Sequence, residues 1–204
     1  MGMTCTLHRV AAARIDGLIG SPASVRAFLE ADDENWIISR PKGLIGFLLR
    51  LTPMSVETAT PKEPLTPEDM DRLRETECDL EGAWHGLHFL FTGTAWEGNE
   101  PACYLVQGGE DLGDDDFDVP PRLLRPEHVR DFNLFLGELS EDELRRRYDP
   151  KRMTGLKIDS VSLWQGATAP AGAVPALLLE AFNELRAFTG RAAAAGDAIV
   201  VHLA

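Results

Sequence analysis

The chain has 204 residues and a formal net charge of −13, and its hydrophobic and charged fractions are 44% and 26%. A chain of this size buries roughly 70% of its unfolded surface, so we expect one folded domain over residues 1–204 rather than a disordered or fibrous protein. The excess negative charge repels nucleic-acid phosphates and anionic lipids, which excludes both as expected partners. Such a charge can recruit a basic protein or a cation, although surplus acid more often serves only solubility.

The cysteines and the apolar segments indicate a cytoplasmic protein. Cys5, Cys78 and Cys103 form an odd set without a C-x-x-C pair, which argues against a secreted disulfide framework. No basic stretch followed by an apolar run marks a signal peptide near the first residue. The longest apolar run, at residues 44–51, is far shorter than the ~20 residues that span a bilayer, so no membrane helix is expected.

The N-terminal part is expected to contain one strand and two helices. Residues 3–10 mix β-branched and apolar side chains and predict a strand, followed by a short helix over residues 11–18. Ser21-Pro22 predicts the start of a second helix, over residues 22–31. The proline-containing residues 35–64 predict an irregular insert whose apolar side chains pack on the core of this protein or on another chain.

The middle of the chain predicts helices followed by a strand and an acidic loop. One helix is expected from residue 66 to about 77, and a more apolar one over residues 80–91. Residues 101–107 predict a strand that ends at two glycines, and residues 110–118 predict a loop rich in aspartate.

The C-terminal part carries the clearest helical pattern. Pro126 predicts a helix start, and Ser140 with Glu143 forms a capping box for a following short helix. Asp149-Pro150 starts one more helical turn. A long helix with one apolar face is expected to end at Gly196; that face comprises Val174, Leu177, Leu178, Ala181, Phe182, Leu185, Phe188 and Ala192. Residues 198–203 predict a central strand covered on both faces, so we expect an α+β fold with several helices packed around one small mixed β-sheet.

Five segments, in order along the chain, carry a family resemblance. They are residues 83–93, which include Trp84-His85-Gly86-Leu87-His88, the glycines at 108–109, and residues 121–129, 147–150 and 196–201. Together they resemble the YfbM-like family, a bacterial domain of unknown function. The resemblance covers essentially the whole chain and implies an α+β fold in a soluble bacterial protein, but it implies no catalytic residue. Two features depart from it: the insert at residues 35–64, and Arg125 where a capping Thr or Ser is expected.

His85 and His88 are three residues apart on a predicted helix, which makes them neighbours and a candidate metal site with Asp79 or Glu81. No third ligand lies at a spacing that the sequence makes readable. We therefore expect no metal: His88 is predicted to lie in the core, bonded to a backbone carbonyl, and His85 at its rim.

Trp84, His85, Arg122 and Tyr148 are aromatic or polar-tipped residues within the family-like segments, and as a group they are the candidate lining of a small-molecule cleft. Taken singly, each is more readily explained as a core residue that satisfies buried hydrogen bonds.

The sequence does not match the other common signatures of catalytic or metal-binding sites. The aspartates of residues 111–118 do not have the spacing of a twelve-residue calcium loop, and Cys103 lies in an apolar run where a thiol is normally inert. The sequence has no G-x-S-x-G, Walker or G-x-G-x-x-G motif, so no cofactor and no catalytic residue are predicted. The sequence favours a non-catalytic protein-binding module with an acidic surface. The alternative is a small-molecule-binding protein or enzyme that uses the four-residue cleft.

Overall fold

The computed structural model describes residues 3–36, 75–113, 117–159 and 174–204, with side chains in the first range described to Leu29. Residues 37–64 of the predicted insert at 35–64 and nearly all of the helix expected at 66–77 lie outside these ranges. Residues 35 and 36 are helical instead of irregular, because the helix that begins at Pro22 runs past its expected end at residue 31. No helix within the described ranges is both long and apolar enough to cross a membrane.

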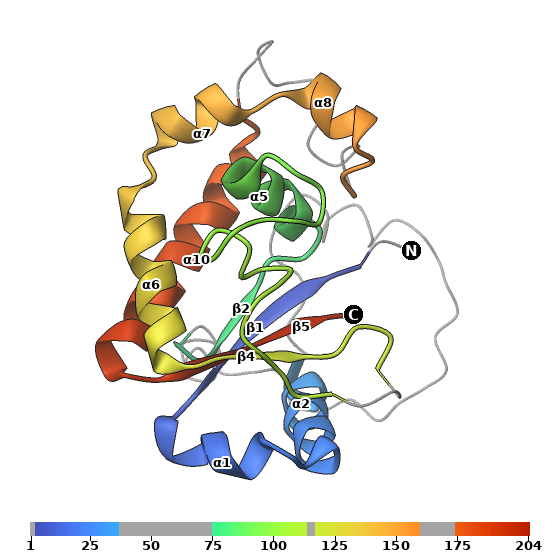
Figure 1. Cartoon of the computed structure of the whole chain (residues 1–204), viewed down its shortest axis with the longest axis vertical. Coiled ribbons are helices and arrows are strands. Elements are labelled where there is room, and N and C mark those ends of the chain that lie inside the picture. Colours follow the sequence, from blue (N-terminus) through green and yellow to red (C-terminus); the bar gives the residue numbers. More distant parts are fainter. Residues whose placement is uncertain (1–2, 37–74, 114–116, 160–173) are drawn as a thin grey trace.

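A five-stranded sheet forms the centre of the fold (Figure 1). In chain order its strands are β1 (Cys5–Val10), β2 (Glu77–Asp79), β3 (Glu110–Asp111), β4 (Arg122–Leu124) and β5 (Ala198–Leu203). Their order across the sheet is β2-β1-β5-β4-β3, and each neighbouring pair is antiparallel. The α+β prediction is confirmed, but the sheet is antiparallel rather than mixed. A mixed sheet needs a crossover that brings in a parallel strand, and each of these strands reverses direction relative to its neighbours.

Strand β5 is central and covered on both faces, as its apolar run predicts. It pairs with β1 in the register Leu7↔Val201 and with β4 in the register Leu123↔Val200. Because side chains alternate between the faces of a strand, Ile199 and Val201 enter a large core while Val200 enters a smaller one. The sheet therefore separates two hydrophobic cores.

Helices cover both faces of the sheet. The large core lies under α5 (Ala83–Thr92), α6 (Pro126–Glu138) and α10 (Ala176–Ala195), which lie on one side of the sheet in Figure 1. The smaller core lies on the other side, under α1 (Ile15–Leu18) and α2 (Pro22–Trp36), and a 3-10 turn, η1 (Ala12–Arg14), precedes α1. Two short helices, α7 (Glu141–Arg147) and α8 (Pro150–Gly155), follow α6 along the chain.

Helix α10 confirms the strongest pattern in the sequence. Its predicted apolar face is buried except for the partly buried Leu177, and the helix contacts α6 and α5. Val174, the first residue of that predicted face, is also buried but precedes the helix, which begins at Ala176. The helix ends at Gly196, which has a left-handed backbone (φ 70°) that glycine adopts without steric cost. The capping box is also present in part, because the Ser140 hydroxyl accepts a hydrogen bond from the Glu143 amide.

Residues 101–107 correct the sequence prediction, because they form consecutive turns instead of a strand. The amides of Val106 and Gln107 both donate to the carbonyl of Cys103, closing tight turns within the segment. Three consecutive residues, Cys103, Tyr104 and Leu105, are buried, which a strand with alternating faces would not produce unless both of its faces were covered. The acidic loop is likewise shorter than predicted, because Glu110 and Asp111 form β3.

The contacts of Arg125 show why an arginine can stand where the family pattern has a capping Thr or Ser. It occupies the N-cap of α6, where a Ser or Thr hydroxyl would usually make the capping hydrogen bond. Here the backbone amide of Arg125 donates to Nδ1 of His128. Its guanidinium makes a two-pronged ion pair with Glu110, with Nη2 2.9 Å from Oε2, which lowers the pKa of Glu110. The residue thus ties the start of α6 to β3.

Candidate functional site

Trp84 and His85 stack against each other in the first turn of α5. Their ring centroids are 4.6 Å apart and the planes differ by 5°. Trp96, in the loop after α5, packs against both rings at 5.8 Å and 4.7 Å. The indole Nε1 of Trp84 donates to the carbonyl of Met3 at 2.9 Å. Two of the four predicted site residues are thus together, but in a fully buried cluster that Trp96 covers.

The imidazole of His85 has a backbone partner at each nitrogen. Nδ1 accepts a hydrogen bond from the amide of Asp159 at 2.9 Å, so Nε2 carries the proton and donates to the carbonyl of Ala95 at 2.8 Å. Burial lowers the pKa of His85, opposed by the Ala95 bond and the nearby Asp159 carboxylate. His85 is fully buried, so its predicted place at the rim is wrong, and its bonds tie α5 to two loops.

His88 is a buried histidine, and within the described ranges its ring nitrogens have no partner at good hydrogen-bond geometry. The prediction that it lies in the core is correct, and the backbone of Glu97 lies close enough to its ring to favour the protonated form, although neither ring nitrogen makes a well-aligned hydrogen bond with the described residues. Burial, and then the neighbouring His85, lower the pKa of His88 to about 4. The ring is therefore neutral at pH 7. The described residues contain no group of three His, Cys, Asp or Glu side chains placed to hold a metal ion.

Arg122 is the third predicted site residue, and it lies in β4 with only 6% of its surface exposed. Its guanidinium donates to the carbonyls of Gly108 (3.2 Å) and Leu105 (3.0 Å). A buried arginine needs such acceptors because an unpaired charge in the core is strongly destabilising. Arg122 therefore anchors the turns of residues 101–108 to β4, the strand next to the edge strand β3.

Tyr148, the fourth predicted site residue, follows α7 and packs at the margin of the large core. Burial raises the pKa of its hydroxyl. Among the described residues, no hydrogen bond or ring contact joins Tyr148 to Trp84, His85 or Arg122. The structure thus brings Trp84 and His85 together and places Arg122 and Tyr148 in separate surroundings.

The three cysteines are buried free thiols. Burial raises the pKa of Cys5 to about 12 and also raises the pKa values of Cys78 and Cys103. Since the thiolate is the nucleophilic form of cysteine, these side chains are unreactive at neutral pH.

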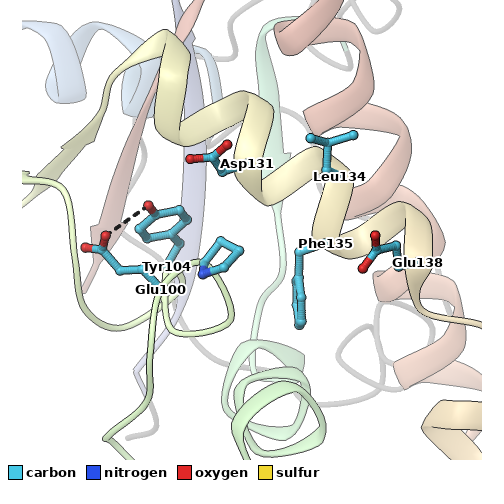
Figure 2. A pocket seen from close by; sticks show the side chains of 7 residues that line it. Glu100, Tyr104, Asp131, Leu134, Phe135 and Glu138 are labelled. Carbon is cyan, nitrogen blue, oxygen red and sulfur yellow. Dashed lines mark hydrogen bonds between the residues drawn. The ribbon is translucent and has the colours of Figure 1, made fainter.

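A groove with acidic side chains lies between α6 and the turns that begin at residue 100 (Figure 2). This acidic groove has a volume of about 350 Å³ and is lined by Glu100, Pro101, Tyr104, Asp131, Leu134, Phe135 and Glu138. Leu134 is 65% exposed, the most exposed large hydrophobic side chain of the described residues. The Tyr104 hydroxyl donates to Glu100 at 3.3 Å, which orients one carboxylate at the mouth of the groove.

The groove includes no residue that the sequence predicts for a site. One signal for it was present: Leu134 lies outside the apolar stripe of α6, which contains Val129, Phe132 and Leu136. A large apolar residue on the polar side of an amphipathic helix indicates a surface contact. A second hollow, of about 490 Å³, lies where the C-terminal end of α5 meets α7 and α8, and it also contains none of the four predicted residues.

Comparisons with known proteins place the chain in a family. No curated protein matches it. Among solved structures, the crystal structure of YfbM from Escherichia coli, a protein of unknown function, has a TM-score of 0.54 and 17% sequence identity and covers 98% of this chain and 99% of that one. This similarity shows a shared fold. The family described as "Domain of unknown function (DUF1877)" matches residues 1–202. The YfbM-like resemblance is therefore confirmed, and the chain belongs to the DUF1877 family.

Proposed function

We propose that the protein is a non-catalytic protein-binding module, and that its acidic groove binds a basic segment of another protein that carries an apolar side chain. The observation that carries the proposal is the exposed Leu134 set among carboxylates in a hollow of the surface. Exposed apolar side chains surrounded by polar ones are typical of protein-interaction sites.

The apolar part of the groove supplies a place for one side chain of the partner. Phe135 projects from α6 on the side where Tyr104 lies, and Leu134 extends from the other side of the same helix as it is drawn in Figure 2. Tyr104 and Phe135 are held by ring contacts with Phe132 in the core, at 5.7 Å and 6.4 Å. The walls of the groove are thus fixed before binding, which lowers the entropic cost of association.

The charged part of the groove selects the sign of the partner. Glu100, Asp131 and Glu138 supply three carboxylates, and among the described residues no lysine or arginine pairs with any of them. A net charge of −13 strengthens the same preference at long range. Complementary charge around an apolar centre speeds encounter and fixes the orientation of the partner.

The second candidate function, a small-molecule cleft around Trp84, His85, Arg122 and Tyr148, has less support. The polar atoms of Trp84 and His85 are bonded to backbone groups, and the guanidinium of Arg122 holds two carbonyls. The observation that favours it is His88, whose buried nitrogens offer a hydrogen-bond partner to a ligand that opens the Trp96 cover.

A quantitative affinity capture tests the proposal. Immobilised wild-type protein is compared with the double variant Leu134→Ser/Glu138→Lys and with the control Leu156→Ser, which alters an exposed leucine (38%) outside the groove. We expect identified partners with basic segments to bind the wild type and the control, and to be depleted about tenfold or more on the double variant, which corresponds to about 1.4 kcal/mol.

Equal capture by all three proteins, or no partner enriched on the wild type, contradicts the proposal. A thermal-shift screen with metabolites is run in parallel on the same three proteins. A metabolite that stabilises all three, and no longer does so after His88→Leu, supports the second candidate function instead.

A further inference from the structure

We propose that the second hollow, at the C-terminal end of α5, is an anion site that binds the phosphoryl groups of a small phosphorylated molecule. We call it the arginine hollow, because Arg146, Arg147 and Arg152 line it. The rest of its lining is Phe89, Leu90, Phe91, Thr92, Gly93 and Asp149. Its volume of about 490 Å³ is within the usual range of ligand sites, roughly 300–1,000 Å³.

Two of the arginines are held in place by the end of α5. Nη1 of Arg147 donates to the carbonyls of Leu90 and Phe91, both at 3.2 Å, and Nη2 of Arg152 donates to the carbonyl of Gly93 at 2.8 Å. The guanidinium of Arg152 also lies 5.7 Å above the ring of Phe89. These contacts fix both side chains before a ligand binds.

The hydrogen bonds from Arg147 and Arg152 change the local charge at the C-terminal end of α5 from negative to positive. The free carbonyls at a helix C-terminus carry partial negative charge and would repel an anion. Here the carbonyls of Leu90, Phe91 and Gly93 accept arginine hydrogen bonds. Anions are therefore attracted where an uncapped helix end would attract cations.

Each fixed guanidinium keeps donors for a ligand. Among the described residues, Nη2 of Arg147 and both Nε and Nη1 of Arg152 have no hydrogen-bond partner. The single carboxylate of the lining, Asp149, already accepts from the amides of Lys151 and Arg152 as the N-cap of α8. Three guanidiniums thus face one engaged carboxylate.

Phosphoryl groups fit this donor arrangement. A guanidinium presents paired N–H groups in a plane, and phosphate oxygens accept them two at a time. Residues 145–152 hold five of the 20 basic residues of the chain, although the chain as a whole carries −13. Glu143, outside the lining, bonds Arg146 and Arg147 and competes with an incoming anion for them.

Isothermal titration with inorganic pyrophosphate at constant ionic strength tests the site. We expect saturable binding with a Kd below about 1 mM, about tenfold weaker in Arg146→Gln and in Arg152→Gln. The matched control is Arg145→Gln, which removes the same charge from the same helix but a side chain that bonds Glu141 and Asp142 outside the hollow. That control should bind as the wild type does, and Glu143→Gln should bind more tightly.

Arg146→Gln is the decisive variant because, within the part of the chain that the structure describes, the guanidinium of Arg146 bonds Glu143 of its own helix and ties no second element in place. Absence of saturable binding up to about 10 mM, or equal weakening by Arg145→Gln and Arg146→Gln, overturns the proposal. Citrate titrated in parallel distinguishes ligand classes, and citrate affinity equal to that of pyrophosphate overturns the assignment to phosphoryl groups. The groove variant Leu134→Ser/Glu138→Lys should bind pyrophosphate normally, which separates this site from the proposed protein-binding function.

Discussion

Replacing Phe132 by alanine is expected to lower the free energy of unfolding by about 3–5 kcal/mol. Phe132 lies on α6 and is fully buried. Its ring contacts Phe91 of α5 at 6.5 Å and Tyr104 of the 101–107 turns at 5.7 Å, both edge to face. Truncation therefore leaves a cavity where three parts of the large core meet. Urea unfolding followed by circular dichroism measures the loss.

The matched control for this prediction is Leu134→Ala, two residues along the same helix. Leu134 is exposed, so its truncation should change stability by no more than about 0.5 kcal/mol. A comparable loss from both substitutions would mean that α6 is not oriented as described. Because Phe132 also supports Tyr104 and Phe135 in the groove, Phe132→Ala should weaken partner binding, whereas Leu134→Ala weakens binding without the loss of stability.

Acidification from pH 7.5 to pH 5 is expected to cost about 2 kcal/mol of folding stability through His88, and about 3 kcal/mol by pH 4. Burial lowers the pKa of His88 from 6.5 to about 4 in the folded protein. Between these values the unfolded chain binds a proton that the folded protein does not, so stability falls as the pH falls through this window. His85, whose pKa burial also lowers, adds to the loss in the same direction.

The variant His88→Leu tests this assignment. Leucine is similar in volume and leaves no unpaired polar atom in the core, so the variant should fold and should lose about 2 kcal/mol less than the wild type between pH 7.5 and pH 5. Urea unfolding at a series of pH values gives the comparison. An unchanged pH dependence in the variant would show that His88 does not titrate as proposed.

The longest elements of the fold are the ones that the sequence predicts best. The apolar face of α10 and the apolar run of β5 are continuous patterns. Each one identifies its element as a helix or a strand, whatever segments pack against it. By contrast β2, β3 and β4 contain two or three residues each, too few for a period to be visible. The sequence predicts a strand at residues 101–107 because it cannot show that the guanidinium of Arg122 bonds the backbone carbonyl of Leu105, a contact between separate segments that no local pattern contains.

The candidate sites also divide into features that a local sequence pattern predicts and features that depend on contacts between distant segments. Trp84 and His85 are adjacent in sequence, so their proximity in one cluster follows from the chain itself. Their complete burial does not, because it depends on Trp96 and on the amide of Asp159. The acidic groove and the arginine hollow each need two or more separate segments to meet, and their polar residues look like ordinary surface charge in the sequence.

Photo-crosslinking tests the central claim, that the acidic groove binds a basic segment of another protein. A photoreactive amino acid is introduced in place of Leu134 and, in a separate control, in place of Leu156, and the adducts formed in cells are identified by mass spectrometry. We predict adducts at position 134 with peptides rich in lysine or arginine, lost when Glu138→Lys is added, and none of these adducts at position 156. Adducts that are the same at both positions, that link position 134 only to acidic peptides or to a second copy of the chain, or that do not form at position 134 would contradict the account.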